Sequence, residues 1–275
     1  MEKICQVCIH QCRLKPGQWG VCRARKNENG ELVCKNYGQV SSLALDPIEK
    51  KPLRRFYPGS KILSVGSYGC NLRCPFCQNH EISMVKPEMA EDHYLSPKEL
   101  ADIAKECREK GNIGVAFTYN EPLVGWEYVL DTAKSVKESG MKNVLVTNGT
   151  ASPEILERLL PYIDAMNIDL KGFREEYYQK LGGSLSAVKE FISRAAKTCH
   201  VELTTLIVPG ENDSVQEMEE EARWIASLNE EIPLHISRFF PRYRMLDAAA
   251  TKVEHIYSLA DTAGKYLRYV YTGNC

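Results

Sequence analysis

Three cysteines stand close together in the stretch GCNLRCPFCQN and form a C-x3-C-x2-C run: Cys70, Cys74 and Cys77. Three thiolates at this spacing can ligate three irons of a [4Fe–4S] cluster. Closed electron-transfer clusters usually carry four thiolates, and no fourth cysteine follows here at a matching spacing. The fourth iron would then be open to a substrate or cofactor, which predicts chemistry at the cluster. The alternatives are a structural metal site, which more often shows paired C-x2-C knuckles, or free core cysteines.

A second group of possible ligands lies at the N-terminus, in the order Cys5, Cys8, His10, Cys12 and Cys22. Cysteine knuckles with a histidine suit tetrahedral zinc, in which His10 would be a ligand or a neighbour of the ligands. The four cysteines could instead hold an auxiliary iron–sulfur cluster, or remain free thiols. So short and polar a segment lacks the apolar content to fold unaided, which favours a bound metal.

Composition narrows the class of protein. The chain has 275 residues, eleven of them cysteine, and a formal net charge of -1, which argues against nucleic-acid binding as the main activity. The first residues lack the apolar core of a signal peptide, and no apolar run is long enough to span a bilayer. We therefore expect a cytoplasmic protein with reduced thiols and no membrane partner. An open iron–sulfur cluster also suggests low-oxygen conditions.

The elements that must position these residues alternate from residue 61 onward. Short apolar runs predict strands, and helical patterns lie between them; Ser96-Pro97-Lys98-Glu99, for example, reads as a capped helix start. Repeated strand–helix units predict parallel strands and a partial parallel (β/α)6 barrel of α/β class. The expected strands are 61–66, 114–118, 143–147, 165–170, 200–208 and 233–236, with a further edge at 267–271. Residues 1–60 are expected to form a small cysteine-rich module with a connector, and residues 61–275 the barrel.

Polar clusters follow several of these strands. In parallel barrels the chemistry sits at the carboxyl ends of the strands, so these clusters should meet on one rim with the cysteine loop. Their convergence is stronger support for an active site than any single motif. The residues concerned are Tyr119, Asn120, Glu121, Asn148, Asp169, Lys171 and His235.

The run GCNLRCPFCQNHEIS resembles the cluster loop of radical S-adenosylmethionine (SAM) enzymes. DPIEKKPLRRFYPGS precedes it, and FTYNEP, VTNGT, NIDLKGF, PLHISRFFPRY and YVYTGN follow it. With these segments the chain resembles the radical enzyme of the AmmeMemoRadiSam system, a group similar to pyruvate formate-lyase activating enzymes. The resemblance covers nearly the whole chain and does not identify the substrate.

The resemblance implies that Cys70, Cys74 and Cys77 ligate the cluster and that SAM chelates the open iron. One electron, from a donor such as flavodoxin or ferredoxin, would cleave SAM and release a 5′-deoxyadenosyl radical. That radical would abstract hydrogen from an unidentified peptide or small molecule. The rival enzyme hypothesis is a glycyl-radical-enzyme activase, and the rival from another class is an iron–sulfur electron carrier or scaffold.

The resemblance also assigns cofactor contacts. Phe76 stands where an aromatic often lies beside the adenine, although it could equally shield the cluster. Residues 119–122, Tyr-Asn-Glu-Pro, match the family's Gly-Gly-Glu-Pro motif, in which Glu121 is a suitable acceptor for the cofactor's ammonium. Taken alone, this tetrapeptide would read as a simple strand-to-helix turn.

Four further residues match rim positions of the activating enzymes. Asn148 is a candidate for ribose or carboxylate contacts, and Asp169 with Lys171 for a charge pair in which Lys171 reaches the cofactor carboxylate. His235 is assigned to the same rim. The alternative for each is an ordinary solvated strand end.

Overall fold

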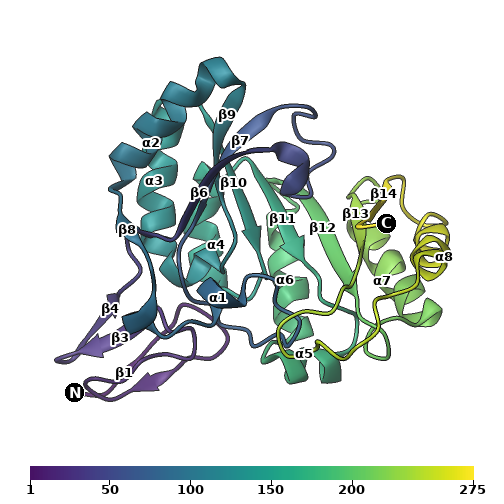
Figure 1. The fold of residues 1–275 in the computed structure, drawn as a ribbon, viewed down its shortest axis with the longest axis horizontal. Helices are drawn as coiled ribbons and strands as arrows, with labels where there is room; N and C mark the ends of the chain where they lie inside the picture. The colour runs from purple at the N-terminus through teal and green to yellow at the C-terminus, as the bar shows by residue number, and fades with distance from the viewer.

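The computed structural model describes residues 1–275 and is organised around one eight-stranded sheet (Figure 1). The order is β14-β13-β12-β11-β10-β9-β7-β6, and every neighbouring pair is parallel except β6 with β7. The bounds are β6 Ser42–Pro47, β7 Lys61–Gly66, β9 Asn112–Phe117, β10 Lys142–Thr147, β11 Ala165–Asp169, β12 His200–Ile207, β13 Leu234–Arg238 and β14 Val270–Gly273. The six predicted parallel strands are confirmed, and β6 and β14 extend the sheet at its two edges.

Helices follow the parallel strands as the alternating pattern predicts. They are α1 His80–Ser83, α2 Pro97–Glu106, α3 Trp126–Glu138, α4 Pro153–Leu159, α5 Glu175–Leu181, α6 Leu185–Ala195, α7 Val215–Leu228 and α8 Val253–Ala263. Ser96 and Glu99 form a complete capping box at the start of α2. None of the helices is long and apolar enough to cross a membrane.

The core lies between the strands and the helices that cover them. Five of the six residues of β7 are buried, as expected for a parallel strand packed on both faces. The helices are amphipathic and turn their apolar faces to the sheet; in α3 these include Val129, Ala133 and Val136. This packing fixes the strand ends, and therefore the loops that follow them.

The N-terminal module consists of short antiparallel pairs. β1 Lys3–Ile4 pairs with β2 Arg13–Leu14, β3 Arg25–Glu28 with β4 Glu31–Cys34, and β5 Gln39–Val40 with β8 His93–Tyr94. The module packs on the loop after β10, where the Ile9 amide donates to the Thr150 carbonyl and the Ser152 amide to the Val7 carbonyl. Residues 42–47, which lie inside the expected N-terminal module, pair with β7 as strand β6.

The segment between β6 and β7 covers the amino ends of the strands. Leu53 is fully buried, and the amides of Arg54 and Arg55 donate to the Glu202 carboxylate at 2.9 and 2.7 Å. The Asn167 side chain donates to the Pro52 carbonyl at 2.9 Å. This end of the sheet is therefore filled by the chain itself.

Candidate active site

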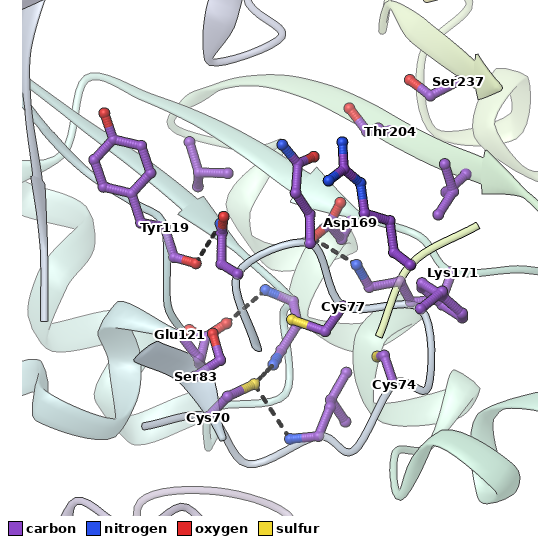
Figure 2. A pocket seen from close by; sticks show the side chains of 18 of the residues that line it. Cys70, Cys74, Cys77, Ser83, Tyr119, Glu121, Asp169, Lys171, Thr204 and Ser237 are labelled. Carbon is purple, nitrogen blue, oxygen red and sulfur yellow. Dashed lines mark hydrogen bonds and ion pairs between the residues drawn. The ribbon is translucent and has the colours of Figure 1, made fainter. Parts of the chain in front are cut away.

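A cavity of about 530 Å³ opens at the carboxyl ends of the parallel strands. Its walls come from the loops after β7, β9, β10, β11 and β13, with Thr204 and Leu206 of β12 in its floor. Figure 2 shows Cys70, Cys74, Cys77, Glu121, Asp169 and Lys171 directed toward a common space. The volume lies within the range of small-molecule and cofactor sites.

The three cysteines of the C-x3-C-x2-C run all line this cavity. The Leu72 amide and the Asn148 side-chain amide donate to Cys70 Sγ at 3.4 and 3.8 Å, the kind of donor that tunes iron–sulfur clusters. Burial raises the pKa of the Cys74 thiol to about 11, so a cationic centre is needed to hold it as thiolate. The donor set, one loop of three cysteines facing one cavity, fits a [4Fe–4S] cluster.

No three His, Cys, Asp or Glu side chains are grouped closely enough to hold a single metal ion. A cluster does not require such grouping, because it binds each cysteine to a different iron. A single zinc ion does require it, since all four ligands lie about 2–2.3 Å from the metal.

Phe76 is both part of the cavity wall and part of an apolar cluster behind it. The cluster contains Leu72, Tyr177 and Val208. The position is compatible with contact to an adenine and with shielding of the cysteine loop, the two roles expected for it.

The Tyr119-Asn120-Glu121 segment lines the cavity beside the cysteine loop. The Asn120 side chain donates to the Tyr68 and Gly69 carbonyls, each at 3.1 Å, and so holds the start of that loop. Glu121 Oε1 accepts from the Thr147 hydroxyl at 2.7 Å, and Oε2 accepts from the backbone amide of Asn148 at 2.7 Å. Glu121 therefore joins two loops, while Oε2 retains capacity for another donor.

Burial raises the pKa of Glu121 to about 7, against the opposing effect of these hydrogen bonds. A positive charge close to this carboxyl group would stabilise its ionised form and lower its pKa. The cofactor's ammonium, assigned to Glu121 by the resemblance, would supply such a charge.

Asn148, Asp169 and Lys171 all line the cavity. The Asn148 side chain donates to Asn71 Oδ1 at 2.9 Å as well as to Cys70. Lys171 Nζ and Asp169 Oδ2 are 2.7 Å apart. Burial opposes the charge of Lys171, but Asp169, Cys74 and Cys77 together outweigh burial and raise the lysine's pKa, so a fixed cation stands at the cavity wall.

The structure does not bring His235 to the cavity. Its Nε2 atom is 2.6 Å from Glu202 Oε2, and its ring stacks on Tyr271 at 5.2 Å. His235 and Ser237 share one face of β13, but only Ser237 reaches the cavity. The prediction that His235 lies on the cavity rim is therefore wrong, and His235 belongs to the hydrogen-bond network around Glu202.

The N-terminal cysteines lie in the same region, but no three of them are close enough to bind one metal ion. Cys5, Cys8 and Cys22 are buried and Cys12 is half-buried. Burial raises the pKa of Cys8 to about 11, opposed by hydrogen bonds to Asn71 and His10, with smaller contributions from Cys22 and Cys12 that raise it further. The four thiols are therefore electrostatic neighbours.

His10 is engaged elsewhere. Its Nε2 atom donates to the Asn71 carbonyl at 2.7 Å, which ties the N-terminal module to the cysteine loop. Cys34 is engaged by another partner, with Sγ 3.1 Å from Asn36 Oδ1.

Several site residues were not identified from the sequence. Thr204 and Ser237 line the cavity, and Asp46 with Lys51 braces Tyr119 from behind. The first two carry no motif. Asp46 and Lys51 lie in the DPIEKK segment, which contributed to the family resemblance but was read only as a connector.

Comparison with known proteins found a matching family and individual relatives. The Radical SAM superfamily matches residues 64–225 of the chain. An uncharacterized protein of Methanocaldococcus jannaschii is 40% identical over 273 residues, covering 98% of this chain and 80% of the relative. The pyruvate formate-lyase 1-activating enzyme of Escherichia coli K12 is 28% identical over 155 residues, covering 53% of this chain and 60% of that enzyme.

A solved structure supports the fold. Streptococcus suis SuiB bound to S-adenosylmethionine superposes with a TM-score of 0.58 over 76% of this chain and 48% of that chain, at 14% identity. At that identity the likeness concerns the fold alone.

Proposed function

The chain belongs to the radical SAM superfamily and is an enzyme of that type, and from this premise we propose that Cys70, Cys74 and Cys77 hold its cluster. Membership of the superfamily implies a [4Fe–4S] cluster and SAM as cofactors. When bound, these groups supply one-electron cleavage of a sulfonium and a carbon radical that abstracts hydrogen. The observation that carries the proposal is that the three cysteines and the polar strand ends share one cavity.

The protein's own part is to bind, orient and exclude water. Lys171, fixed by Asp169, is proposed to receive the cofactor's carboxylate, and Asn148 its ribose or carboxylate. Glu121 is proposed to accept from the ammonium through Oε2. Phe76 and its apolar neighbours keep water from the site, which strengthens each of these polar contacts.

The far wall of the cavity is proposed to face the substrate, an unidentified peptide or small molecule. Arg238 is held in place there, since its Nε donates to the Thr251 carbonyl at 2.6 Å and its guanidinium lies 4.5 Å from the Phe240 ring. Arg242 also lines this wall, and neither arginine forms an ion pair with the chain. We assign the enzyme to the AmmeMemoRadiSam type, with flavodoxin or ferredoxin as the kind of electron donor.

The decisive experiment is anaerobic reconstitution followed by reduction with SAM present. The wild-type protein should contain a [4Fe–4S] cluster and form 5′-deoxyadenosine. Replacing Cys70, Cys74 and Cys77 together with Ala should remove the cluster of the cavity and abolish cleavage, because no other cysteine lines the cavity. The Cys107→Ala variant, altered outside the cavity, is the control and should cleave SAM normally. Undiminished cleavage by the triple variant would sink the proposal.

A second candidate is a glycyl-radical-enzyme activase, favoured by the likeness to the E. coli activating enzyme. We rank it second because the extra cysteines precede the cluster loop, and none follows Cys77 until Cys107. Electron paramagnetic resonance (EPR) after incubation with reductant, SAM and pyruvate formate-lyase should show no glycyl doublet. A stoichiometric doublet would make the activase the leading function.

Residues 1–60 are proposed to form a module with its own metal on Cys5, Cys8, Cys12 and Cys22. Zinc and a second iron–sulfur cluster are the two candidates, and the separation of the thiols favours the cluster, because a single zinc ion would require them to draw closer together. The triple variant of the cluster loop should then retain about one equivalent of zinc or one cluster. Adding Cys5→Ser and Cys22→Ser should remove it, whereas adding Cys34→Ser should not. A metal-free triple variant would refute this site.

A further inference from the structure

Tyr119 has an unusual backbone. Its φ is +70°, in the left-handed region that a bulky side chain rarely adopts. Such a conformation costs of order 1–3 kcal/mol and persists only where surrounding contacts impose it. The residue stands directly after β9, at the cavity wall, so contacts that impose this conformation also shape the site.

Three contacts hold the Tyr119 ring on the side away from the cavity. The hydroxyl donates to Asp46 Oδ2 at 2.8 Å, and Lys51 Nζ lies 4.6 Å from the ring centroid. The ring also packs on Gly66 of β7, where an added Cβ would come within 2.8 Å of Tyr119 Cδ2. The side chain is therefore fixed between an ion pair and a strand backbone.

Asp46 and Lys51 form that ion pair in a largely buried setting. Lys51 Nζ and Asp46 Oδ2 are 2.9 Å apart, and the Lys51 side chain is only 4% exposed. The same carboxylate oxygen thus receives both the lysine and the tyrosine hydroxyl. A buried charged group with several partners is rigid, because losing any partner leaves a charge unsatisfied.

On the cavity side, the backbone after this ring meets the cysteine loop. The Tyr119 carbonyl accepts from Asn79 Nδ2 at 2.7 Å, two residues after Cys77. The Glu121 amide donates to the Gly69 carbonyl at 3.3 Å, one residue before Cys70. Both ends of the cysteine loop are therefore tied to the three residues that the ring orients.

We propose that Tyr119 is a positioning residue for SAM: the Asp46–Lys51 pair clamps its ring, and the clamped ring fixes the 119–121 backbone against both ends of the cysteine loop. This inference rests on the proposed SAM site and deepens it. The competing possibility is that the contact only anchors residues 46–51 and has no effect on SAM binding in the cavity.

The test compares SAM affinity in the anaerobically reconstituted proteins. Tyr119→Phe removes the hydroxyl and keeps the ring, so folding and iron content should match the wild type. We expect its Kd for SAM to rise about tenfold, equivalent to about 1.4 kcal/mol. In turnover the KM for SAM should rise similarly, while kcat at saturating SAM stays within twofold.

Two further variants and a second readout complete the test. Asp46→Ala removes both the hydrogen bond to Tyr119 and the ion pair with Lys51, so it should weaken SAM binding at least as much. The double variant should bind no more weakly than Asp46→Ala alone, because that variant has already lost the shared hydrogen bond. Backbone hydrogen exchange at 118–121 should accelerate in Tyr119→Phe. The matched control is Tyr37→Phe, which breaks a similar hydroxyl bond to Asp131 at 2.9 Å outside the cavity and should bind SAM normally.

The inference is overturned if Tyr119→Phe binds SAM within twofold of the wild type, or if Tyr37→Phe weakens binding equally. It is also overturned if the loss of binding only follows a loss of iron. A wild-type protein that holds its cluster but does not bind SAM would instead refute the proposed function, so the two failures are distinguishable.

Discussion

The two ends of the parallel strands use the same kinds of polar group for opposite purposes. At the carboxyl end, cysteines, a lysine–aspartate pair and amide side chains surround a cavity of about 530 Å³. At the amino end, the Glu202 side chain has no exposed surface and accepts from His200, His235 and the amides of Arg54 and Arg55. One end leaves polar atoms available to a ligand, and the other satisfies them from its own chain.

The difference shows what distinguishes a site from a structural network. Residue type does not separate the two ends, since each has carboxylates and amides in a buried setting. What separates them is whether the chain supplies all the partners, because unpaired buried polar groups are costly and pairing removes the penalty. Variants at the carboxyl end should therefore change ligand binding, and variants at the amino end should change stability.

The largest effect is expected at Lys171. Lys171→Gln removes the fixed cation from the cavity wall and should weaken SAM binding about a hundredfold, or about 2.7 kcal/mol. Calorimetric titration of SAM into reconstituted protein measures the change, with iron content as a check. Lys180→Gln, which breaks the exposed pair with Glu211, should leave SAM affinity unchanged. Equal affinity of Lys171→Gln and the wild type would contradict the comparison.

The next effect concerns Glu202. Glu202→Gln replaces one accepting oxygen by an NH2 group, which then faces N–H donors that it cannot accept from. This change should lower the free energy of unfolding by about 2 kcal/mol. Denaturant titration measures this loss, and SAM affinity should stay within twofold of the wild type. Glu190→Gln, at an exposed helical ion pair, should cost less than about 0.5 kcal/mol. Loss of SAM binding without loss of stability would place Glu202 in the active site instead.

The same carboxylate predicts acid sensitivity. Burial alone would raise the pKa of Glu202, but hydrogen bonds from His200, His235 and two backbone amides lower it from 4.5 to about 2. A lowered pKa gives stability that is complete above pH 4.5 and lost as pH falls toward 2, with roughly half of it gone by pH 3. Stability of Glu202→Gln should fall less steeply with pH in that window, and parallel profiles would contradict the assignment.

The smallest effect, of opposite sign, is expected at Glu221 of α7. Burial raises the pKa of this carboxyl to about 8, opposed by the Thr205 hydroxyl and raised further by Glu217. Its folded form prefers to be neutral, so stability is lost as pH rises from 4.5 to 8. Glu221→Gln should therefore stabilise the protein by about 1 kcal/mol at pH 8.5 and hardly at all at pH 5. Unfolding at the two pH values tests this, and destabilisation at pH 8.5 would show that Glu221 is charged and paired.

Local patterns in the sequence carried much of the fold. The six parallel strands were predicted within two residues of their bounds, whereas the edge run expected at 267–271 starts three residues before β14. Ser96 with Glu99 predicted the start of α2. Burial periodicity and capping both depend on near neighbours, so the sequence shows them. The cysteine loop was visible for the same reason, since its three cysteines lie within eight residues. Edge strand β6 was missed because its pairing with β7 crosses a polar connector that gives no periodic signal.

Only the tertiary structure determined how close a strand residue lies to the cavity and which distant residues it contacts. His235 and Ser237 point to the same face of one strand, yet one lies in the Glu202 network and the other at the cavity. Tyr119 meets Asp46 across 73 residues, and His235 meets Glu202 across 33. Sequence spacing fixes the face on which a strand residue lies, but its depth and its partner depend on strand stagger and on which segment fills the end of the barrel.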